Sequence, residues 1–381
     1  MARRGESIFK RKDGRWEARV IEYRGDGQRF YRSLYGKTYG EVKGKKERYI
    51  AFSHSIALGE AKKSPIFSEQ AEHWLASVKS SVKESTYTRY YRTVHSYLLP
   101  LLGKYAVGRI DITIVNRLKE ALLIGGGKRK NGLSEKTVTD ILSVLKLIIN
   151  HAAAEGFEVI NTSLIRDPKQ KKKNMQIIPQ EQSKRLEEIL LASNDPLSLG
   201  ILLALHTGIR NGELCGLKWG DVCFLTGTLH IRRIVERISD LDPLHKAKTK
   251  LIIGEPKTAS SRREISLPTA LCAYLKQRCG NADEYILTGT SKPSEPHTLY
   301  VRYSRFLRRN GFDSYTFHAL RHTFATRGIE SGFDTKSLSE ILGHSDVTTT
   351  LKCYVHPSLE QKRRQMEALF DGKIRGQKYG N

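Results

Sequence analysis

The segment Thr316–Tyr354 decides how the rest of the chain is interpreted. It reads TFHALRH over 316–322, LGH over 342–344 and TLKCY over 350–354. On a helix His318 and Arg321 stand three residues apart and therefore share a face. One further helix after His344 would bring Tyr354 back to the same place. A guanidinium group, imidazoles and a phenol that meet in one pocket suggest chemistry on a phosphodiester.

A second arginine lies in an earlier box, which reads TGIRNGELCGL over 207–217. Arg210 follows Gly208, which predicts a buried turn into a helix, and Glu213 on the same helical face would hold the guanidinium group. In-line attack on a phosphodiester adds negative charge to the non-bridging oxygens, and the bidentate forks of Arg210 and Arg321 suit that charge. The alternative is a structural Arg–Glu pair on a solvated helix.

These boxes resemble the tyrosine recombinase (phage integrase) family, over about residues 177–370 and in the family's order. The family has an early Arg, an HxxR box, a later His or Trp and a Tyr nucleophile. The resemblance implies that Tyr354 attacks the scissile phosphate to form a 3′-phosphotyrosyl link, without a cofactor or a metal. It implies a general base in His318 and a phosphate donor in His344, with His322 and Glu213 as supporting residues.

By the same resemblance, a mobile lysine in a β-turn protonates the leaving 5′-oxygen. The pattern PKTxxSxR over 256–263 favours Lys257 for this role. Residues 241–253 look like an insertion and contain three other candidates for the general acid, Lys246, Lys248 and Lys250. A zinc site is a further alternative, through His318, His322, His344 and His356. It is disfavoured because no HExxH motif is present and Arg321 would set a cation beside the metal.

The charge of the chain points to a polyanionic partner. There are 65 Lys and Arg against 40 Asp and Glu, a net charge of +25, and nucleic acid is the commonest such partner. A membrane surface would favour one basic amphipathic helix, whereas here the excess is spread along the chain. No apolar run approaches a membrane span of roughly 20 residues, and five cysteines without a CxxC pair fit a reducing cytoplasm.

Residues 1–63 predict a small three-stranded β-sheet followed by a helix. Strands are expected over 7–12, 15–23 and 28–35, with a helix over 38–58. The segment is rich in basic residues, and it resembles the arm-type DNA-binding domain of many integrases; the alternative is a basic sheet that only caps the fold. Candidate DNA contacts are Lys10, Lys12, Arg15, Arg19, Arg24, Arg29 and Arg32.

Residues 64–168 predict an all-α, four-helix module that resembles the family's core-binding domain. A basic linker over 169–176 contains Lys171, Lys172 and Lys173, which lie along DNA phosphates or form a solvated tether. A mixed α+β, mainly helical catalytic domain is expected over 177–370, with strands at 228–235 and 264–267, and a tail over 371–381.

Together these features predict a multidomain bacterial integrase of a phage or an integrative conjugative element, acting in the cytoplasm. Its expected partner is double-stranded DNA with core and arm sites, on which it would form a homotetramer. An accessory excision protein or a host DNA-bending protein is a further candidate partner. The alternatives are a type IB topoisomerase, which shares the active-site logic, and a DNA-binding regulator that kept the fold and lost the chemistry.

Overall fold

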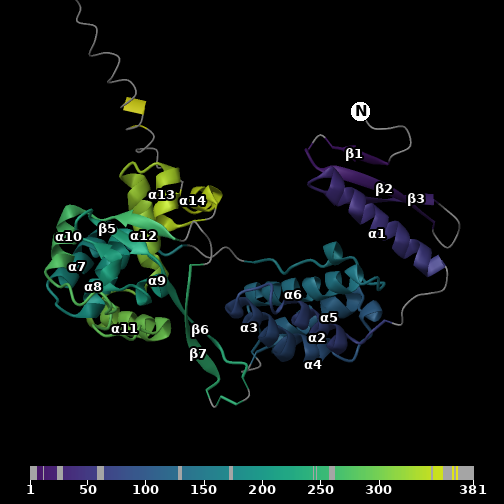
Figure 1. Cartoon of the computed structure of the whole chain (residues 1–381), viewed down its shortest axis with the longest axis horizontal. Coiled ribbons are helices and arrows are strands. Elements are labelled where there is room, and N and C mark those ends of the chain that lie inside the picture. The colour runs from purple at the N-terminus through teal and green to yellow at the C-terminus, as the bar shows by residue number, and fades with distance from the viewer. Residues whose placement is uncertain are drawn as a thin grey trace, which may run out of the picture. The chain divides into compact units, whose positions relative to one another are not determined.

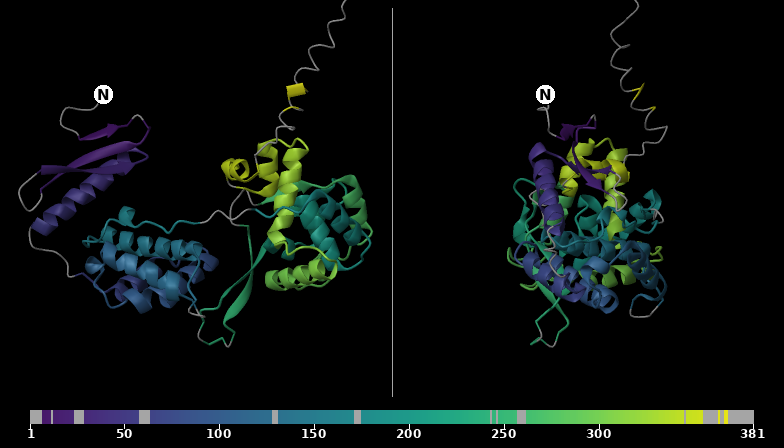
Figure 2. Two further views of the ribbon diagram at one scale, coloured as in Figure 1. Left: turned by 180° about the vertical axis from the view of Figure 1, so that it is seen from behind. Right: turned by 90° about the vertical axis from the view of Figure 1, so that its right-hand side faces the viewer.

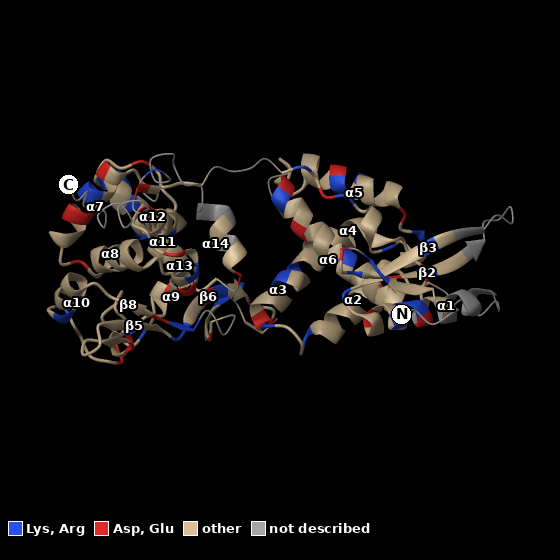
Figure 3. Cartoon of the chain, turned by 90° about the horizontal axis from the view of Figure 1, so that it is seen from above, with Lys and Arg blue, Asp and Glu red and all other residues tan. Residues whose placement is uncertain are grey.

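The computed structural model divides the chain into two compact units, residues 1–170 and residues 171–381 (Figure 1). It describes residues 7–11, 13–23, 29–57, 64–127, 131–170, 175–242, 244–245, 247–256, 262–344, 346–354, 363 and 366–367. Lys and Arg are distributed over helices and strands of both units (Figure 3).

The first unit begins with the predicted three-stranded sheet and helix. Strands β1 (Ile8–Lys10), β2 (Trp16–Tyr23) and β3 (Arg29–Gly36) pair antiparallel in that order, and helix α1 (Tyr39–Ala57) follows. Side chains alternate across the sheet, so one face supplies a small core of Ile8 and Ala18, which pack with Val42 of α1. The opposite face is not covered by this core.

Helices make up the rest of the first unit. They are α2 (Phe67–Val78), α3 (Glu84–Thr93), α4 (Leu99–Leu102), α5 (Ile112–Gly125) and α6 (Glu135–Ala154), and a π-helical turn over Val94–Leu98 joins α3 to α4. All of these helices contribute to one apolar core. By length and composition alone α6 could span a membrane, but its residues Leu142, Leu145 and Ile148 are buried in that core.

The second unit is mainly helical and is built around α8 (Pro196–Thr207), most of whose residues are buried. Its other helices are α7 (Gln180–Leu191), α9 (Asn211–Cys215), α10 (Thr269–Lys276), α11 (Pro296–Arg309), α12 (Phe317–Glu330), α13 (Thr335–Leu342) and α14 (Val347–Tyr354). The prediction of a mainly helical second half is confirmed.

Two small sheets complete the second unit. Strands β4 (Val222–Cys223), β5 (Thr228–Ile231) and β8 (Arg263–Ser266) form one sheet, while β6 (Ile234–Ser239) and β7 (Thr249–Gly254) form a separate hairpin that projects from the helices (Figure 1; Figure 2). The prediction of one strand over 228–235 is wrong. The chain leaves the first sheet at Arg232 and Arg233, because the Arg233 guanidinium turns inward to Asp221 (2.7 Å) and the carbonyl of Gly216 (3.2 Å).

Candidate functional site

Arg321 ties three helices of the second unit together. It lies on α12, is only 2% exposed, and donates to the carbonyl oxygens of Gly208 (2.7 Å) and Leu342 (2.6 Å). These carbonyls lie at the C-terminal ends of α8 and α13, where the helix dipole favours a cation. Folding therefore fixes this guanidinium group before any substrate arrives.

The two chain reversals beside Arg321 depend on glycine. Gly208 and Gly343 cap α8 and α13 with a φ of 64° each, a left-handed conformation that side chains disfavour. A Cβ at Gly208 would also lie 2.6 Å from the Phe324 ring and 2.9 Å from a Leu342 methyl group. The turn at Gly208 thus allows the end of α8 to approach α12 and α13 closely.

Arg210 occupies the N-cap of α9, as the sequence predicts. Its Nη1 donates to Glu213 Oε1 (2.7 Å) and its Nη2 to the carbonyl of Gly343 (3.0 Å), and Glu213 Oε2 also accepts from the Arg210 backbone amide (2.9 Å). The side chain of Arg210 is 31% exposed, so this guanidinium group is more accessible to a ligand than that of Arg321.

Glu213 binds a second arginine that the sequence analysis did not assign to the site. Arg263 of β8 donates to both carboxylate oxygens of Glu213, at 3.1 and 2.9 Å, and to the carbonyl of Ile341. Burial alone would raise the pKa of Glu213, but hydrogen bonds and charges of Arg263 and Arg210 outweigh it and lower the pKa to about 2. Arg263 is the last residue of the PKTxxSxR pattern, and this pattern is the feature of the sequence that could have indicated its place in the site.

Three histidines lie beside the arginines. The rings of His318 and His322 on α12 meet edge to face at 4.5 Å, and His344 follows the Gly343 turn. His344 Nδ1 lies 2.7 Å from the hydroxyl of Thr350 on α14, a fully buried residue that the sequence analysis did not single out. Burial, with the charges of Arg321 and Arg210, lowers the pKa of both His318 and His344.

We expect these histidines to make the free protein sensitive to acid. The pKa falls from 6.5 to about 4 for His344, because of burial and Arg321, and to about 4 for His322, because of burial and His318. Between pH 6.5 and 4 the native state then binds fewer protons than the unfolded chain, so the free energy of unfolding falls as the pH falls through this window. Urea unfolding at several pH values measures the slope.

A matched pair of variants isolates this slope. His344→Gln removes one titrating group and should flatten the acid loss, whereas His297→Gln, at an exposed position on α11, should leave it unchanged. An equal slope in the wild type and in His344→Gln would show that His344 does not titrate in this way.

Of the two remaining predicted site residues, the structure describes the backbone position of Tyr354 and does not describe Lys257. Tyr354 is the last residue of α14, four positions after Thr350, so the two positions share a face of the helix. Lys257 lies outside the described residues, in the connection from β7 to β8. Those strands belong to different sheets, so this connection leads from the hairpin to the other sheet.

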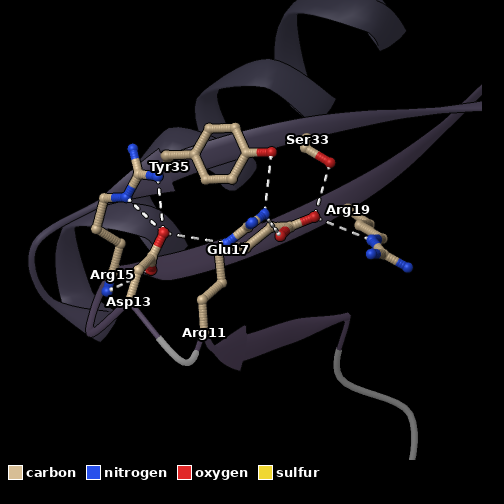
Figure 4. A network of polar contacts seen from close by, with 7 residues as sticks. All are labelled: Arg11, Asp13, Arg15, Glu17, Arg19, Ser33 and Tyr35. Atoms are coloured by element: carbon tan, nitrogen blue, oxygen red, sulfur yellow. Dashed lines mark hydrogen bonds and ion pairs between the residues drawn. The ribbon is translucent and has the colours of Figure 1, made fainter.

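The open face of the N-terminal sheet carries a network of arginines around one buried carboxylate (Figure 4). Glu17 is 2% exposed and accepts from Arg11 Nη1 (2.7 Å), Arg19 Nε (3.0 Å) and the Ser33 hydroxyl (2.8 Å). Burial raises the pKa of Glu17, but these three hydrogen bonds outweigh it and the pKa is lowered. The carboxylate therefore stays charged and holds the guanidinium groups of Arg11, which follows β1, and of Arg19, which lies on β2.

Aromatic rings also contact Arg11 and Arg19, and one of them contacts Arg15 as well. The guanidinium carbons of Arg11 and Arg15 lie 5.5 and 5.6 Å from the ring centre of Tyr35, and Arg19 lies 5.0 Å from that of Phe9. Such cation–π contacts restrict side chains that would otherwise be mobile. This face thus presents three oriented guanidinium groups beside the exposed Tyr31.

The predicted DNA contacts are divided between the two faces of this sheet. Arg15 and Arg19 belong to the open face, together with Arg11, which the sequence analysis did not name as a candidate contact. Arg32 lies 5.3 Å from the ring of Tyr49 on α1, and Lys10 pairs with Trp16, so both are on the helix side. Outside the described residues, or without a described side chain, are Lys12, Arg24, Arg29, Lys171, Lys172 and Lys173.

Comparison with known proteins identifies relatives of both units. The model of the Phage integrase family matches residues 176–361, and that of the Phage integrase, N-terminal SAM-like domain matches residues 66–117. A Tyrosine recombinase XerC-like protein of Caldanaerobacter subterraneus subsp. tengcongensis is 28% identical over 373 residues, covering 91% of this chain and 93% of the relative. Tyrosine recombinase XerA of Thermococcus onnurineus is 25% identical and covers 68% and 84%.

Solved structures show the same fold. The Tn1549 transposon integrase in complex with transposon right end DNA has a TM-score of 0.63 at 20% identity, over 79% of this chain and 99% of that one. A lambda integrase tetramer bound to a Holliday junction has a TM-score of 0.54 at 17% identity, over 93% and 96%. Together with the two family models and the arrangement of Arg210, His318, Arg321 and His344, these likenesses show that the chain belongs to the phage integrase family of tyrosine recombinases.

Proposed function

We propose that this protein is a site-specific DNA recombinase, an integrase that cuts and rejoins DNA strands to integrate and excise a mobile element. The observation that carries this function is the convergence of two guanidinium groups and two imidazoles from α9, α12 and the turn after α13. Their electrostatic coupling is direct, since Arg210 and Arg321 both lower the pKa of His318 and of His344. A single phosphate fits this set of donors.

The reaction proceeds by two transesterifications. The Tyr354 oxygen attacks the scissile phosphorus, the bond from phosphorus to the 5′-oxygen breaks, and a 3′-phosphotyrosyl link forms. His318 can take the phenolic proton, because its lowered pKa keeps the ring neutral near pH 7. Attack by a 5′-hydroxyl of another strand then releases Tyr354. The phosphodiester bond energy is kept in the covalent link, so the reaction balances without ATP.

The arginines and His344 stabilise the charge that develops on the phosphate. Arg210 and Arg321 are already oriented by backbone carbonyls and by Glu213, so little reorganisation is needed in the transition state. When the Thr350 hydroxyl donates to His344 Nδ1, the ring proton lies on Nε2. His344 can then donate to a non-bridging oxygen from the opposite nitrogen.

Lys257 is the proposed general acid for the leaving 5′-oxygen, and a sulfur leaving group tests it. Lys257→Ala should slow cleavage of an ordinary phosphodiester by about 10²- to 10⁴-fold. A substrate with a 5′-bridging sulfur should be cleaved at nearly the wild-type rate, because a thiolate leaves without a proton. Lys248→Ala and Lys250→Ala serve as matched controls. If the sulfur substrate restores cleavage in one of these variants and not in Lys257→Ala, the general acid is that lysine instead of Lys257.

A nicked suicide substrate from the protein's own attachment site tests the function as a whole. The wild-type protein should form a covalent adduct and should then join the cleaved strand to a second duplex. Adduct formation with resealing of only the original strand would indicate a topoisomerase. DNA binding without any adduct would indicate a regulator that has lost the chemistry.

The remaining assignments follow the division of the chain. Residues 1–63 would bind arm sites, and the four-helix module over 64–168 would bind core sites. The linker over 169–176 would lie along DNA phosphates. Residues 177–370 would carry the chemistry, and a tail over 371–381 follows. Double-stranded DNA is the proposed partner, bound by a homotetramer in the bacterial cytoplasm. The tetramer of lambda integrase on a Holliday junction supports this assembly, and an accessory excision or DNA-bending protein would complete it.

Glu17→Gln should separate sequence-specific from non-specific DNA binding. The substitution frees Arg11 and Arg19 from the carboxylate and removes one negative charge from the open face. Affinity for random DNA should therefore stay the same or rise, while discrimination in favour of arm-site DNA should fall about tenfold or more, because oriented arginines read bases. Competition mobility-shift titrations with the full chain measure both quantities.

The matched control is Glu41→Gln, which removes one negative charge from the exposed Glu41–Lys45 pair on α1. It should change non-specific affinity and leave discrimination intact. Equal discrimination in Glu17→Gln and the wild type would show that the network does not orient the reading side chains.

A further inference from the structure

Two histidines and a glutamate converge between α2 and α6 in the first unit. His73 Nδ1 lies 3.0 Å from Glu155 Oε1, and His151 Nδ1 lies 3.5 Å from Glu155 Oε2. One ligand atom from each of the three residues lies within 4.8 Å of the others, and this group is the one of its kind within the described part of the chain. None of the three is used in the proposed recombination chemistry.

A buried amide lies between two members of this group, His151 and Glu155. Gln70 is 2% exposed, and its Nε2 lies 3.1 Å from His151 Nδ1 and 2.6 Å from Glu155 Oε2. The lone pairs of an imidazole and a carboxylate are thus aimed at one point, where an amide group now donates to both. A cation bound there would replace those two hydrogen bonds with two coordinate bonds.

The spacing of the ligand atoms suits a tetrahedral metal. Bonds of about 2.0–2.1 Å to nitrogen and oxygen place neighbouring ligands about 3.3 Å apart. His73 Nδ1 lies 3.0 Å from one Glu155 oxygen and His151 Nδ1 lies 3.5 Å from the other, so one side chain must rotate to bring both nitrogens to the same oxygen. His73 has a 64% exposed side chain, so it can turn without disturbing the core. The i, i+4 spacing of His151 and Glu155 brings both ligands to one face at the end of α6.

An adjoining pocket leaves room for a fourth ligand. It has a volume of about 460 Å³ and is lined by Pro65, Glu69, Gln70, His73, Glu155 and Phe157. Glu69 precedes His73 by one helical turn and can supply a carboxylate, and a rotated Gln70 amide can supply its oxygen. Water from the pocket completes the set where neither does.

We propose that His73, His151 and Glu155 form a structural site for a divalent transition metal, with Zn²⁺ as the preferred ion. Imidazole and carboxylate ligands at this spacing suit Zn²⁺ better than the hard cations, which favour all-oxygen sites. The bound ion joins α2 to the end of α6 and so stabilises the helical part of the first unit. The site is independent of the recombinase activity, and its loss leaves the proposed catalytic residues in place.

Cobalt substitution tests the site in the tag-free, chelator-treated full-length chain. We expect one equivalent of Co²⁺ to give the visible absorption of tetrahedral coordination and Zn²⁺ to displace it. His73→Ala and Glu155→Gln should each weaken Zn²⁺ binding by more than the roughly 10- to 100-fold that loss of an outer partner costs. Zn²⁺ should also raise the Tm of the wild type and not that of His73→Ala.

Two controls make the result decisive. His95→Ala breaks an ordinary His95–Glu72 pair (3.0 Å) of the same helical region and should bind Zn²⁺ like the wild type. His322→Gln breaks the pair of histidines at i, i+4 spacing on α12, His318 and His322, and should also bind Zn²⁺ normally. Absence of Zn²⁺ binding, or binding that survives His73→Ala and is lost in His322→Gln, would overturn the proposal.

Discussion

The Tyr354→Phe variant is expected to bind DNA like the wild type and to form no covalent adduct with it. Phenylalanine lacks the oxygen that attacks the phosphorus, so cleavage should fall by at least about 10⁴-fold. The hydrogen bond between His344 Nδ1 and the Thr350 hydroxyl anchors α14 one turn before this residue, and the substitution leaves that anchor intact. Adduct formation on a nicked suicide substrate, resolved by denaturing electrophoresis, measures the effect.

Tyr300→Phe is the matched control for the nucleophile. Tyr300 lies on α11 and is 42% exposed, and removal of its hydroxyl should leave adduct formation unchanged. Seventeen tyrosines are present in the chain, so this comparison is needed. An adduct that persists in Tyr354→Phe would place the nucleophile at another tyrosine.

Glu213→Ala is expected to lower the free energy of unfolding by about 3–5 kcal/mol, the range observed when one partner of a buried ion pair is removed. Glu213 is 2% exposed, and its partner Arg263 is 5% exposed. The alanine variant leaves the Arg263 charge buried without its carboxylate and releases the Arg210 guanidinium group. Equilibrium urea unfolding measures the stability, and the adduct assay should show slower cleavage in the protein that remains folded.

A pair with the same spacing on the surface provides the control. Arg327 and Glu330 are also three residues apart, but their side chains are 32% and 48% exposed. Glu330→Ala should cost no more than about 1 kcal/mol, as exposed pairs usually do. A similar decrease in the free energy of unfolding in Glu213→Ala and Glu330→Ala would mean that burial does not decide how much Glu213 stabilises the fold.

Periodic patterns allowed much of the fold to be predicted. The α12 and α13 helices, the α9 turn and the N-terminal strands follow from local spacing, caps and glycines, which act within a few residues. The Arg210–Glu213 pair was also accessible, because it is a contact within one helical turn. Family order then indicated which distant boxes belong together.

Contacts between distant segments were beyond sequence reasoning. Arg263 reaches Glu213 across 50 residues, and the PKTxxSxR pattern that ends on Arg263 does not indicate which carboxylate it binds. The break after Ile231 was missed because apolar residues resume at Ile234 and Val235, two residues after the break, whereas the contact of Arg233 with Asp221 that accompanies it is not local. Strand register also decides on which face of the N-terminal sheet a basic residue lies. In the structure this register places Arg32 on the face that is covered by α1.

The position of Arg321 limits how this protein can lose its activity by mutation. Arg321 is a catalytic candidate and also the tie between the ends of α8 and α13, so a mutation there removes folding and chemistry together. The role proposed for Tyr354, the last residue of α14, is the attack on the phosphorus. A descendant that has become a silent DNA-binding protein should therefore have lost the tyrosine and kept the buried arginine.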